Sequence, residues 1–216
     1  QVKSNQQRND CYSDLRDLIE RFEEMGEIEK VNGADWNLEV AAVAETVAAQ
    51  DPGRAPALLF DNIEGYPEGF RILAGGANGL RRLAVVMDLP DPETEMDLVR
   101  SMRRRMRTKF EPIPPLKVST GPVMENIDRG SDINMWKFPV PFVHELDGGR
   151  YIGTDDLVIM RDPDTGWVNC GTYRTMVHDE TNVAVWMSPG KHGRLISDKY
   201  FKRGEDCPVL ISCGQD

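Results

Sequence analysis

Three prolines in a short stretch, Pro112, Pro114 and Pro115, constrain the fold of this chain more than any other feature. Proline fixes φ and lacks a backbone N–H, so a helix or a central strand does not continue through such a cluster. Before the cluster, helix-like and strand-like patterns alternate, and after it short strand-like runs are separated by Gly, Pro and Asp. The sequence therefore predicts an α+β fold, with an N-terminal α/β domain over residues 13–115 and a second domain over residues 116–216.

The N-terminal pattern predicts helices that alternate with strands, after a disordered tail over residues 1–12. Apolar residues at helical spacing follow Ser13, which we expect to cap the first helix, and Gly26 ends that helix. A later helix has its acidic residues first and its arginines last, an order that complements the helix dipole. The predicted helices cover residues 13–26, 38–50, 80–89 and 92–109, and the predicted strands cover residues 27–31, 57–63 and 70–76.

The second domain is expected to be a barrel or sandwich of short strands. The run DPDTG has the chemistry of a hairpin turn between two of these strands. One helix interrupts the strands, from Arg194 to Arg203, and Gly204 ends it. Strand-like runs cover residues 118–127, 136–145, 150–162, 166–179, 182–190 and 207–214.

Charge and cysteine usage exclude some classes of function. A formal net charge of −10 argues against bulk affinity for nucleic acid or anionic lipid. The basic stretch over residues 100–109 is either a nucleic-acid patch or a solvated helix face, and the lack of interleaved aromatic residues favours the solvated face. The four cysteines lack metal-ligand spacing, so we expect free thiols, with Cys170 and Cys213 packed in strands.

The expected location is cytoplasmic. No apolar run approaches the roughly 20 residues that span a bilayer. The polar N-terminal residues lack the apolar core of a secretory signal.

Polar residues between strands and turns gather over residues 167–193. His192 precedes the predicted helix, where backbone N–H groups bind anions and where a positive helix end favours the neutral, metal-binding imidazole. Lys191 adds a charge for phosphate at the same turn. His144 and His178 lie in loop and strand-end contexts, and we expect structural roles for both.

Asn169 and Arg174 each have two open interpretations. The amide of Asn169, inside an apolar strand, either bonds neighbouring backbone or gives its oxygen to a hard cation such as Mg²⁺ or Mn²⁺. Arg174 either forms a structural ion pair or grips a carboxylate or phosphate. In a regular strand the two side chains point to opposite faces, so a shared function needs a bulge or bend, for which Gly171 is suited.

The runs NCGTYR, SPGKHGRL and KYFKRGEDCPVLISCG, in this order, resemble the UbiD family of decarboxylases, which use prenylated FMN. The segments SDLRDLIERFEEMGEIEKV and GGRYIGTDDLVIMRDPDTGWVN are also similar to that family, so the resemblance extends over nearly the whole chain after residue 12. It implies an N-terminal α/β domain followed by a flavin-binding split β-barrel, incomplete at the C-terminus.

The resemblance also implies roles for site residues. Asn169 and His192 would bind Mn²⁺ or Mg²⁺, with K⁺ nearby. Arg174 would be the catalytic residue beside the substrate carboxylate. The residues that would contact the prenylated FMN are Asn169, Thr172, Tyr173, Arg174, Lys191 and His192.

The implied reaction is the reversible non-oxidative decarboxylation of aromatic, heteroaromatic or α,β-unsaturated acids through a covalent adduct with prenylated FMN. The implied partners are the small carboxylic acid substrate, a flavin prenyltransferase that supplies the cofactor, and further copies of the chain in a homo-oligomer, with no nucleic acid and no membrane. The family's third metal ligand and its proton donor match no position up to Asp216, so we expect an incomplete site in a fragment or split subunit. A non-catalytic flavin- or metal-binding subunit that needs a partner chain is the alternative.

Overall fold

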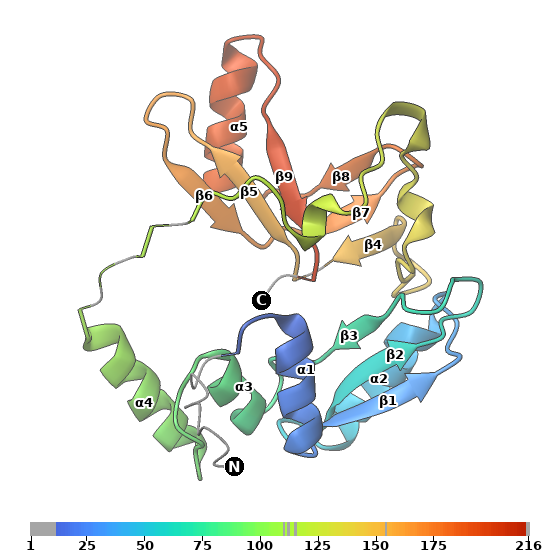
Figure 1. Cartoon of the computed structure of the whole chain (residues 1–216), viewed down its shortest axis with the longest axis vertical. Coiled ribbons are helices and arrows are strands. Elements are labelled where there is room, and N and C mark those ends of the chain that lie inside the picture. The colour runs from blue at the N-terminus through green and yellow to red at the C-terminus, as the bar shows by residue number, and fades with distance from the viewer. Residues whose placement is uncertain (1–11, 110, 112, 115, 154, 215–216) are drawn as a thin grey trace, which may run out of the picture.

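The computed structural model describes residues 12–109, 111, 113–114, 116–153 and 155–214 (Figure 1). The described part is an α+β structure with three small open sheets. The first group of elements comprises α1 (Leu15–Glu24), β1 (Ile28–Asn32), α2 (Glu39–Gln50), β2 (Ala57–Asp61), β3 (Ile72–Ala74), α3 (Leu80–Val86) and α4 (Glu95–Arg107). The predicted helices and strands of the N-terminal part are confirmed, with β1 one residue later than predicted and the others shorter. Residues 1–11 of the predicted tail lie outside the described residues.

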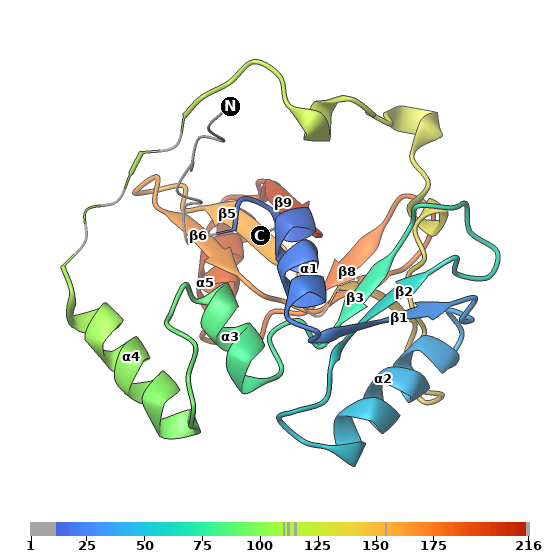
Figure 2. The ribbon, with the colours of Figure 1, turned by 60° about the horizontal axis from the view of Figure 1, so that its bottom comes forward.

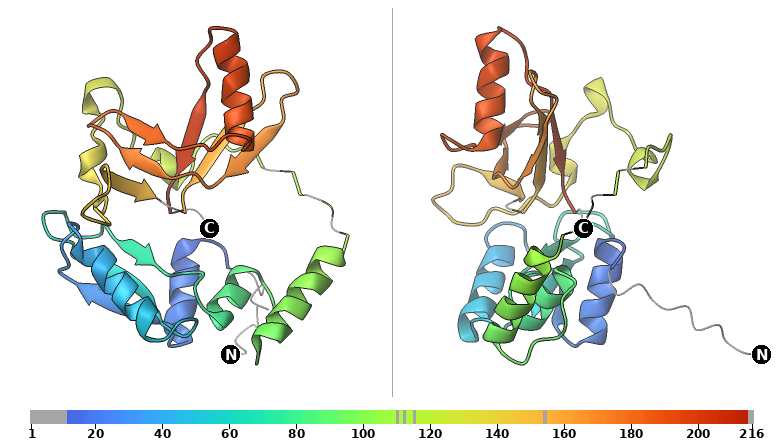
Figure 3. Two further views of the ribbon diagram at one scale, coloured as in Figure 1. Left: turned by 180° about the vertical axis from the view of Figure 1, so that it is seen from behind. Right: turned by 90° about the vertical axis from the view of Figure 1, so that its left-hand side faces the viewer.

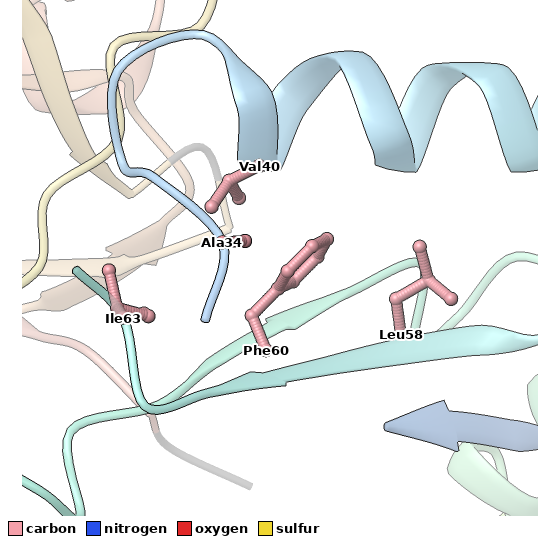
Figure 4. Packing of buried hydrophobic residues seen from close by; sticks show 5 residues of the cluster. All are labelled: Ala34, Val40, Leu58, Phe60 and Ile63. Carbon is pink, nitrogen blue, oxygen red and sulfur yellow. The ribbon is translucent and has the colours of Figure 1, made fainter. Parts of the chain in front are cut away.

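The N-terminal sheet has the strand order β1-β2-β3, with β1 parallel and β3 antiparallel to β2. Helices cover both faces of β2, which explains why its run ALLF is apolar without alternation. On one face, α2 packs on β2 in a cluster shown in Figure 4, and on the other face Leu18 and Phe22 of α1 pack on Ala57. The cluster in Figure 4 consists of Ala34, Val40, Leu58, Phe60 and Ile63.

The caps of α1 and α4 show how local sequence sets helix ends. Asp14, not Ser13, caps α1, because its carboxylate accepts hydrogen bonds from the backbone N–H groups of Arg16 and Asp17. A hydrogen bond from the Arg16 side chain is the main cause that lowers the pKa of Asp14 to about 2. At α4, Thr94 and Asp97 form a reciprocal capping box. This helix ends at Arg107, before the prolines, as predicted.

Residues 116–149 contain single turns of 3-10 helix instead of the strands expected over 118–127 and 136–145. Those two predictions were wrong. Pro122, Pro139 and Pro141 have no N–H to donate to a strand ladder. The segment runs as a wide arc (Figure 2) and forms an isolated β-bridge with the N-terminal part between Asn37 and Phe142.

The remaining elements form two antiparallel sheets and one helix. The strand orders are β4-β7-β8 and β6-β5-β9. The chain passes between the two sheets after β4, after β6 and, through α5, after β8. Beside the first two crossings the Thr175 hydroxyl donates a buried hydrogen bond of 2.6 Å to Asp156. The elements are β4 (Arg150–Gly153), β5 (Leu157–Arg161), β6 (Val168–Gly171), β7 (Thr175–Val177), β8 (Val183–Val185), α5 (His192–Lys202) and β9 (Val209–Ser212).

Helix α5 stands on the sheet of β5 and β6 (Figure 3), where Ile196 packs against Val158 and Met160. The hairpin turn predicted at DPDTG joins β5 to β6. Cys170 and Cys213 are exposed, which contradicts their predicted packing. Cys170 follows the buried Asn169, and neighbouring strand residues face opposite sides of a sheet.

Arg150, the first residue of β4, joins the N-terminal part to the elements that follow it, β4–β9 and α5. Its guanidinium lies 3.6 Å from the ring centroid of Trp36 and 5.0 Å from that of Trp136. It donates hydrogen bonds of 2.6 Å to the Tyr66 hydroxyl and to the Val140 carbonyl. The planar guanidinium therefore stacks on aromatic rings while its edge donates hydrogen bonds.

We expect Arg150→Ala to lower the free energy of unfolding by about 2–4 kcal/mol, because stacking and charge-assisted hydrogen bonds are lost together. Arg150→Lys should lose less, since it keeps the charge but not the planar fork. Urea unfolding checks this, with Arg103→Ala on the exposed face of α4 as a control that stays within about 0.5 kcal/mol. Equal stabilities of Arg150→Ala and the control would contradict the expectation.

Candidate functional site

The candidate site lies where β6 ends and α5 begins. Asn169 of β6 is only 5% exposed. Its amide Nδ2 donates to the hydroxyl of Tyr173 at 3.4 Å. Within the described residues its carbonyl oxygen accepts no hydrogen bond, so this oxygen is free to bind a ligand.

Tyr173 connects the strand to the helix. After β6 ends at Gly171 the chain leaves the sheet, and the Tyr173 ring packs against the cluster of Val158, Met160 and Ile196. The Tyr173 hydroxyl accepts a hydrogen bond of 3.0 Å from the backbone N–H of Gly193, in the first turn of α5. One oxygen atom therefore holds both the Asn169 amide and the start of α5.

Two glycines make room for the Tyr173 side chain. A Cβ at Gly171 would lie 2.8 Å from Cε2 of Tyr173. A Cβ at Gly193 would lie 3.0 Å from the Tyr173 hydroxyl oxygen and 2.7 Å from the sulfur of Met187. Neither glycine has a positive φ, so space, and not backbone conformation, requires glycine at both positions.

His192 is the first residue of α5, which begins two residues before the predicted Arg194. Its ring lies perpendicular to the Trp167 indole, at an interplanar angle of 88° with centroids 5.1 Å apart. Trp167 lies directly before β6, two positions ahead of Asn169. The Trp167 ring contacts His192 directly, and the Asn169 amide reaches the Gly193 backbone through the Tyr173 hydroxyl, so both side chains lie next to the start of α5.

The remaining predicted site residues are exposed. No side chain of Thr172, Arg174 or Lys191 forms a hydrogen bond or ion pair with a described residue. Arg174 contributes its backbone, whose carbonyl accepts from the Trp186 N–H at 3.0 Å. β6 ends at Gly171, so strand alternation does not extend to Arg174 and does not place its side chain opposite that of Asn169. Contact of these three side chains with Asn169 and His192 stays a prediction.

The donor set fits a cation and an anion side by side. An amide oxygen and a neutral imidazole suit a hard or borderline divalent cation. The start of α5 presents the positive end of its dipole, which favours a phosphate beside that cation. The described residues contain no group of three His, Cys, Asp or Glu side chains placed to hold a metal ion.

Ion pairs fix the hairpin before β6 against the second half of α5. Lys199 contacts Asp162 at 2.5 Å and Asp164 at 3.0 Å, and Arg203 pairs with Asp164. The hydrogen bond from Lys199 is the main cause that lowers the pKa of Asp162 to about 2. Sequence patterns do not reveal this contact, the Trp167–His192 contact or the Tyr173–Gly193 hydrogen bond, because each joins residues far apart in the chain.

A groove of about 450 Å³ follows α5 beside Met187, Leu195 and Cys207. None of the predicted site residues lines it, so the candidate site is distinct from this groove. None of the described helices has the length and apolarity needed to cross a membrane.

Two family models match the chain. The model described as the 3-octaprenyl-4-hydroxybenzoate carboxy-lyase N-terminal domain matches residues 19–102. The model described as the Rift-related domain of the same carboxy-lyase matches residues 116–216. The unmatched residues between the two include the proline cluster.

Curated relatives include decarboxylases. The chain is 34% identical over 210 residues to the pyrrole-2-carboxylic acid decarboxylase of Pseudomonas aeruginosa, covering 93% of this chain and 41% of that protein. It is 29% identical to ferulic acid decarboxylase 1 of Saccharomyces cerevisiae, covering 93% of this chain and 42% of that protein. The chain thus spans about two-fifths of the length of these relatives.

Solved structures agree in fold. The vanillic acid decarboxylase of Sedimentibacter hydroxybenzoicus in its closed form has a TM-score of 0.81 at 28% identity, covering 94% of this chain and 43% of that one. The UbiD-class enzyme HmfF of Pelotomaculum thermopropionicum, in complex with FMN, has a TM-score of 0.79 at 26% identity, covering 94% and 43%. With both family models, these relatives and these structures in agreement, the chain belongs to the UbiD family.

Proposed function

We propose that this chain carries the N-terminal part of the site of a reversible, non-oxidative decarboxylase that acts on aromatic, heteroaromatic or α,β-unsaturated carboxylic acids. The observation that carries the proposal is the pairing of Asn169 with the start of α5 through the Tyr173 hydroxyl. The pairing places a free amide oxygen and an imidazole beside a helix N-terminus. The decarboxylases among the relatives support the reaction class.

The proposed architecture is a flavin-binding split barrel, built on the sheets of β4–β9, that follows an N-terminal α/β domain. The matched ranges 19–102 and 116–216 support domains over residues 13–115 and 116–216. Val209 and Leu210 of β9 are 42% and 56% exposed, and an apolar strand at a sheet edge favours a further covering element. The greater length of the relatives supports the proposal that residues outside this stretch complete the barrel and its site.

The proposed cofactor is prenylated FMN with Mn²⁺ or Mg²⁺, and K⁺ nearby. HmfF has been solved with FMN, and an evolved dimeric form of it with prenylated FMN. When bound, the flavin would supply the electron sink that decarboxylation needs. Asn169 and His192 would hold the divalent cation, and Lys191 would hold the phosphate by its charge.

Arg174 is the proposed catalytic residue. Its guanidinium has no acidic partner among the described residues, so its donor groups are available to a substrate carboxylate. A bidentate grip would orient the carboxylate for loss of CO₂. Thr172 and Tyr173 lie between this arginine and β6, and the exposed Thr172 would contact the cofactor.

The proposed partners are a flavin prenyltransferase, which supplies the cofactor, and further copies of the chain in a homo-oligomer. Co-expression with a prenyltransferase tests the function as a whole. We expect the purified protein to carry a prenylated flavin, seen by absorbance and mass, and to release CO₂ from a panel that includes pyrrole-2-carboxylic acid and ferulic acid. A flavin-free protein that is inactive on the whole panel would count against the proposal.

Asn169→Ala and His192→Ala should each lose the divalent metal and the flavin together, because the cation links the side chains to the phosphate. Metal analysis and flavin absorbance of the co-expressed variants measure this. His178→Ala is the matched control, since His178 is exposed at the end of β7. Retention of both metal and flavin in either site variant refutes the ligand assignment.

Arg174→Ala should keep most of the bound flavin and lose about 100-fold or more in kcat/KM, because its guanidinium acts on the reacting carboxylate. Arg71→Ala, an exposed arginine outside the site, serves as the control. Steady-state kinetics with flavin-normalised enzyme give the comparison. Loss of flavin in proportion to the loss of activity would assign Arg174 to cofactor binding alone.

Tyr173→Phe should weaken metal binding about 10-fold, because the Asn169 amide and the Gly193 N–H lose their shared acceptor while the ring still fills its slot. Titration of the metal-free protein with Mn²⁺ in the presence of FMN measures the affinity. Tyr200→Phe, which removes a hydroxyl that donates to the Arg161 carbonyl, is the matched control. Equal affinities in the two variants would contradict the orienting role of the Tyr173 hydroxyl.

A further inference from the structure

Trp167 is an exposed aromatic residue that belongs to none of the hydrophobic core clusters of the described residues. Its side chain remains 49% exposed, yet its ring lies 5.1 Å from the His192 ring in perpendicular geometry. Perpendicular aromatic pairs attract each other beyond the apolar area that they bury. The contact therefore restricts the orientation of the imidazole.

The backbone of Trp167 is fixed. Its carbonyl accepts from the Asp162 N–H at 2.8 Å, and its N–H donates to the Thr165 hydroxyl at 3.3 Å, which closes the β5–β6 hairpin. Asp162 also pairs with Lys199 of α5. The Asp162–Lys199 ion pair thus joins the β5–β6 hairpin, which carries the indole, to α5, which carries His192. The positions of the two rings are therefore fixed relative to each other by contacts other than their own.

The His192 ring needs such a contact. A metal-binding histidine is usually oriented by a hydrogen bond from its second ring nitrogen to a carboxylate or carbonyl. Within the described part of the chain, neither ring nitrogen of His192 has a hydrogen-bond partner, and the ring contact is with Trp167. An exposed imidazole without either restraint samples several rotamers, and each must be given up when a metal binds.

We infer that Trp167 is a positioning residue that orients His192 toward the cation shared with Asn169, an inference that rests on the proposed metal site. Trp167, directly before β6, and Asn169, in β6, both lie next to the start of α5. On one side the indole contacts His192, and on the other the Asn169 amide reaches Gly193 through Tyr173. These contacts restrict the rotamers of the His192 ring and of the Asn169 amide before a metal binds.

The test measures Mn²⁺ affinity in the purified, metal-free protein at saturating FMN, by calorimetry or by the electron paramagnetic resonance signal of free Mn²⁺. Trp167→Leu should weaken Mn²⁺ binding about 3- to 10-fold, and Trp167→Phe, which keeps an aromatic ring, should weaken it less. The matched control is Trp186→Leu, because Trp186 is also exposed, at 63%, and lines the groove outside the site. The melting temperatures of the two leucine variants should be alike.

The outcomes separate the inference from the proposed function. If His192→Ala abolishes Mn²⁺ binding while Trp167→Leu binds as tightly as the wild type, the positioning role is overturned and the metal site stands. If His192→Ala still binds Mn²⁺ normally, the metal site fails and the inference fails with it.

A measurement on the unaltered protein covers the case in which Trp167→Leu does not fold. Nuclear Overhauser contacts between the ring protons of His192 and the indole protons should be present without metal, with His178 as the reference histidine. Their absence would overturn the inference.

Discussion

The hydroxyl oxygen of Tyr173 lies where β6 leaves its sheet and where α5 begins, and the rest of the site depends on its two hydrogen bonds. One comes from the buried amide of Asn169 and the other from the backbone of Gly193. The first bond occupies the amide nitrogen, and the amide oxygen accepts no hydrogen bond from a described residue, so it is available to the proposed cation. The second fixes the helix start that carries His192. Gly171 and Gly193 leave the space that this ring occupies, because a Cβ at either position would lie too close to it.

Further contacts join the segment around β6 to both ends of α5. The ion pairs of Lys199 with the β5–β6 hairpin act at the far end of α5, and the Trp167–His192 pair acts at the near end. Arg150, whose guanidinium lies over the rings of Trp36 and Trp136, holds β4 against the N-terminal part. Several independent contacts therefore fix the two elements that carry Asn169 and His192, the residues proposed to bind the metal.

The sequence predicts much of the fold wherever the signal is local. Helical spacing locates α1 and α2, the run ALLF locates β2, and DPDTG locates a hairpin. The strand predictions over 118–127 and 136–145 failed because β-propensity needs a partner strand. Residues 136–145 pack against the N-terminal part instead, through Phe70 and Phe138 and through the bridge at Phe142. In residues 118–127 the apolar side chains of Val118 and Val123 are exposed.

For the site, residue type and family resemblance indicate Asn169 and His192, and the structure places them on facing elements. The contacts that orient them have no sequence signature. The hydroxyl of Tyr173 meets a backbone N–H 20 residues away, and Lys199 meets an aspartate 37 residues away. Spatial neighbours at such separations depend on how the sheets and α5 pack, which no periodicity encodes.

The position of the metal tests the proposed site most directly. Crystals of the protein co-expressed with a flavin prenyltransferase and supplied with Mn²⁺ would give an anomalous difference map at the manganese edge. We expect a peak about 2–2.5 Å from the Asn169 side-chain oxygen and from a ring nitrogen of His192, beside the flavin phosphate. A flavin-bound structure whose manganese peak lies away from both residues would contradict this expectation.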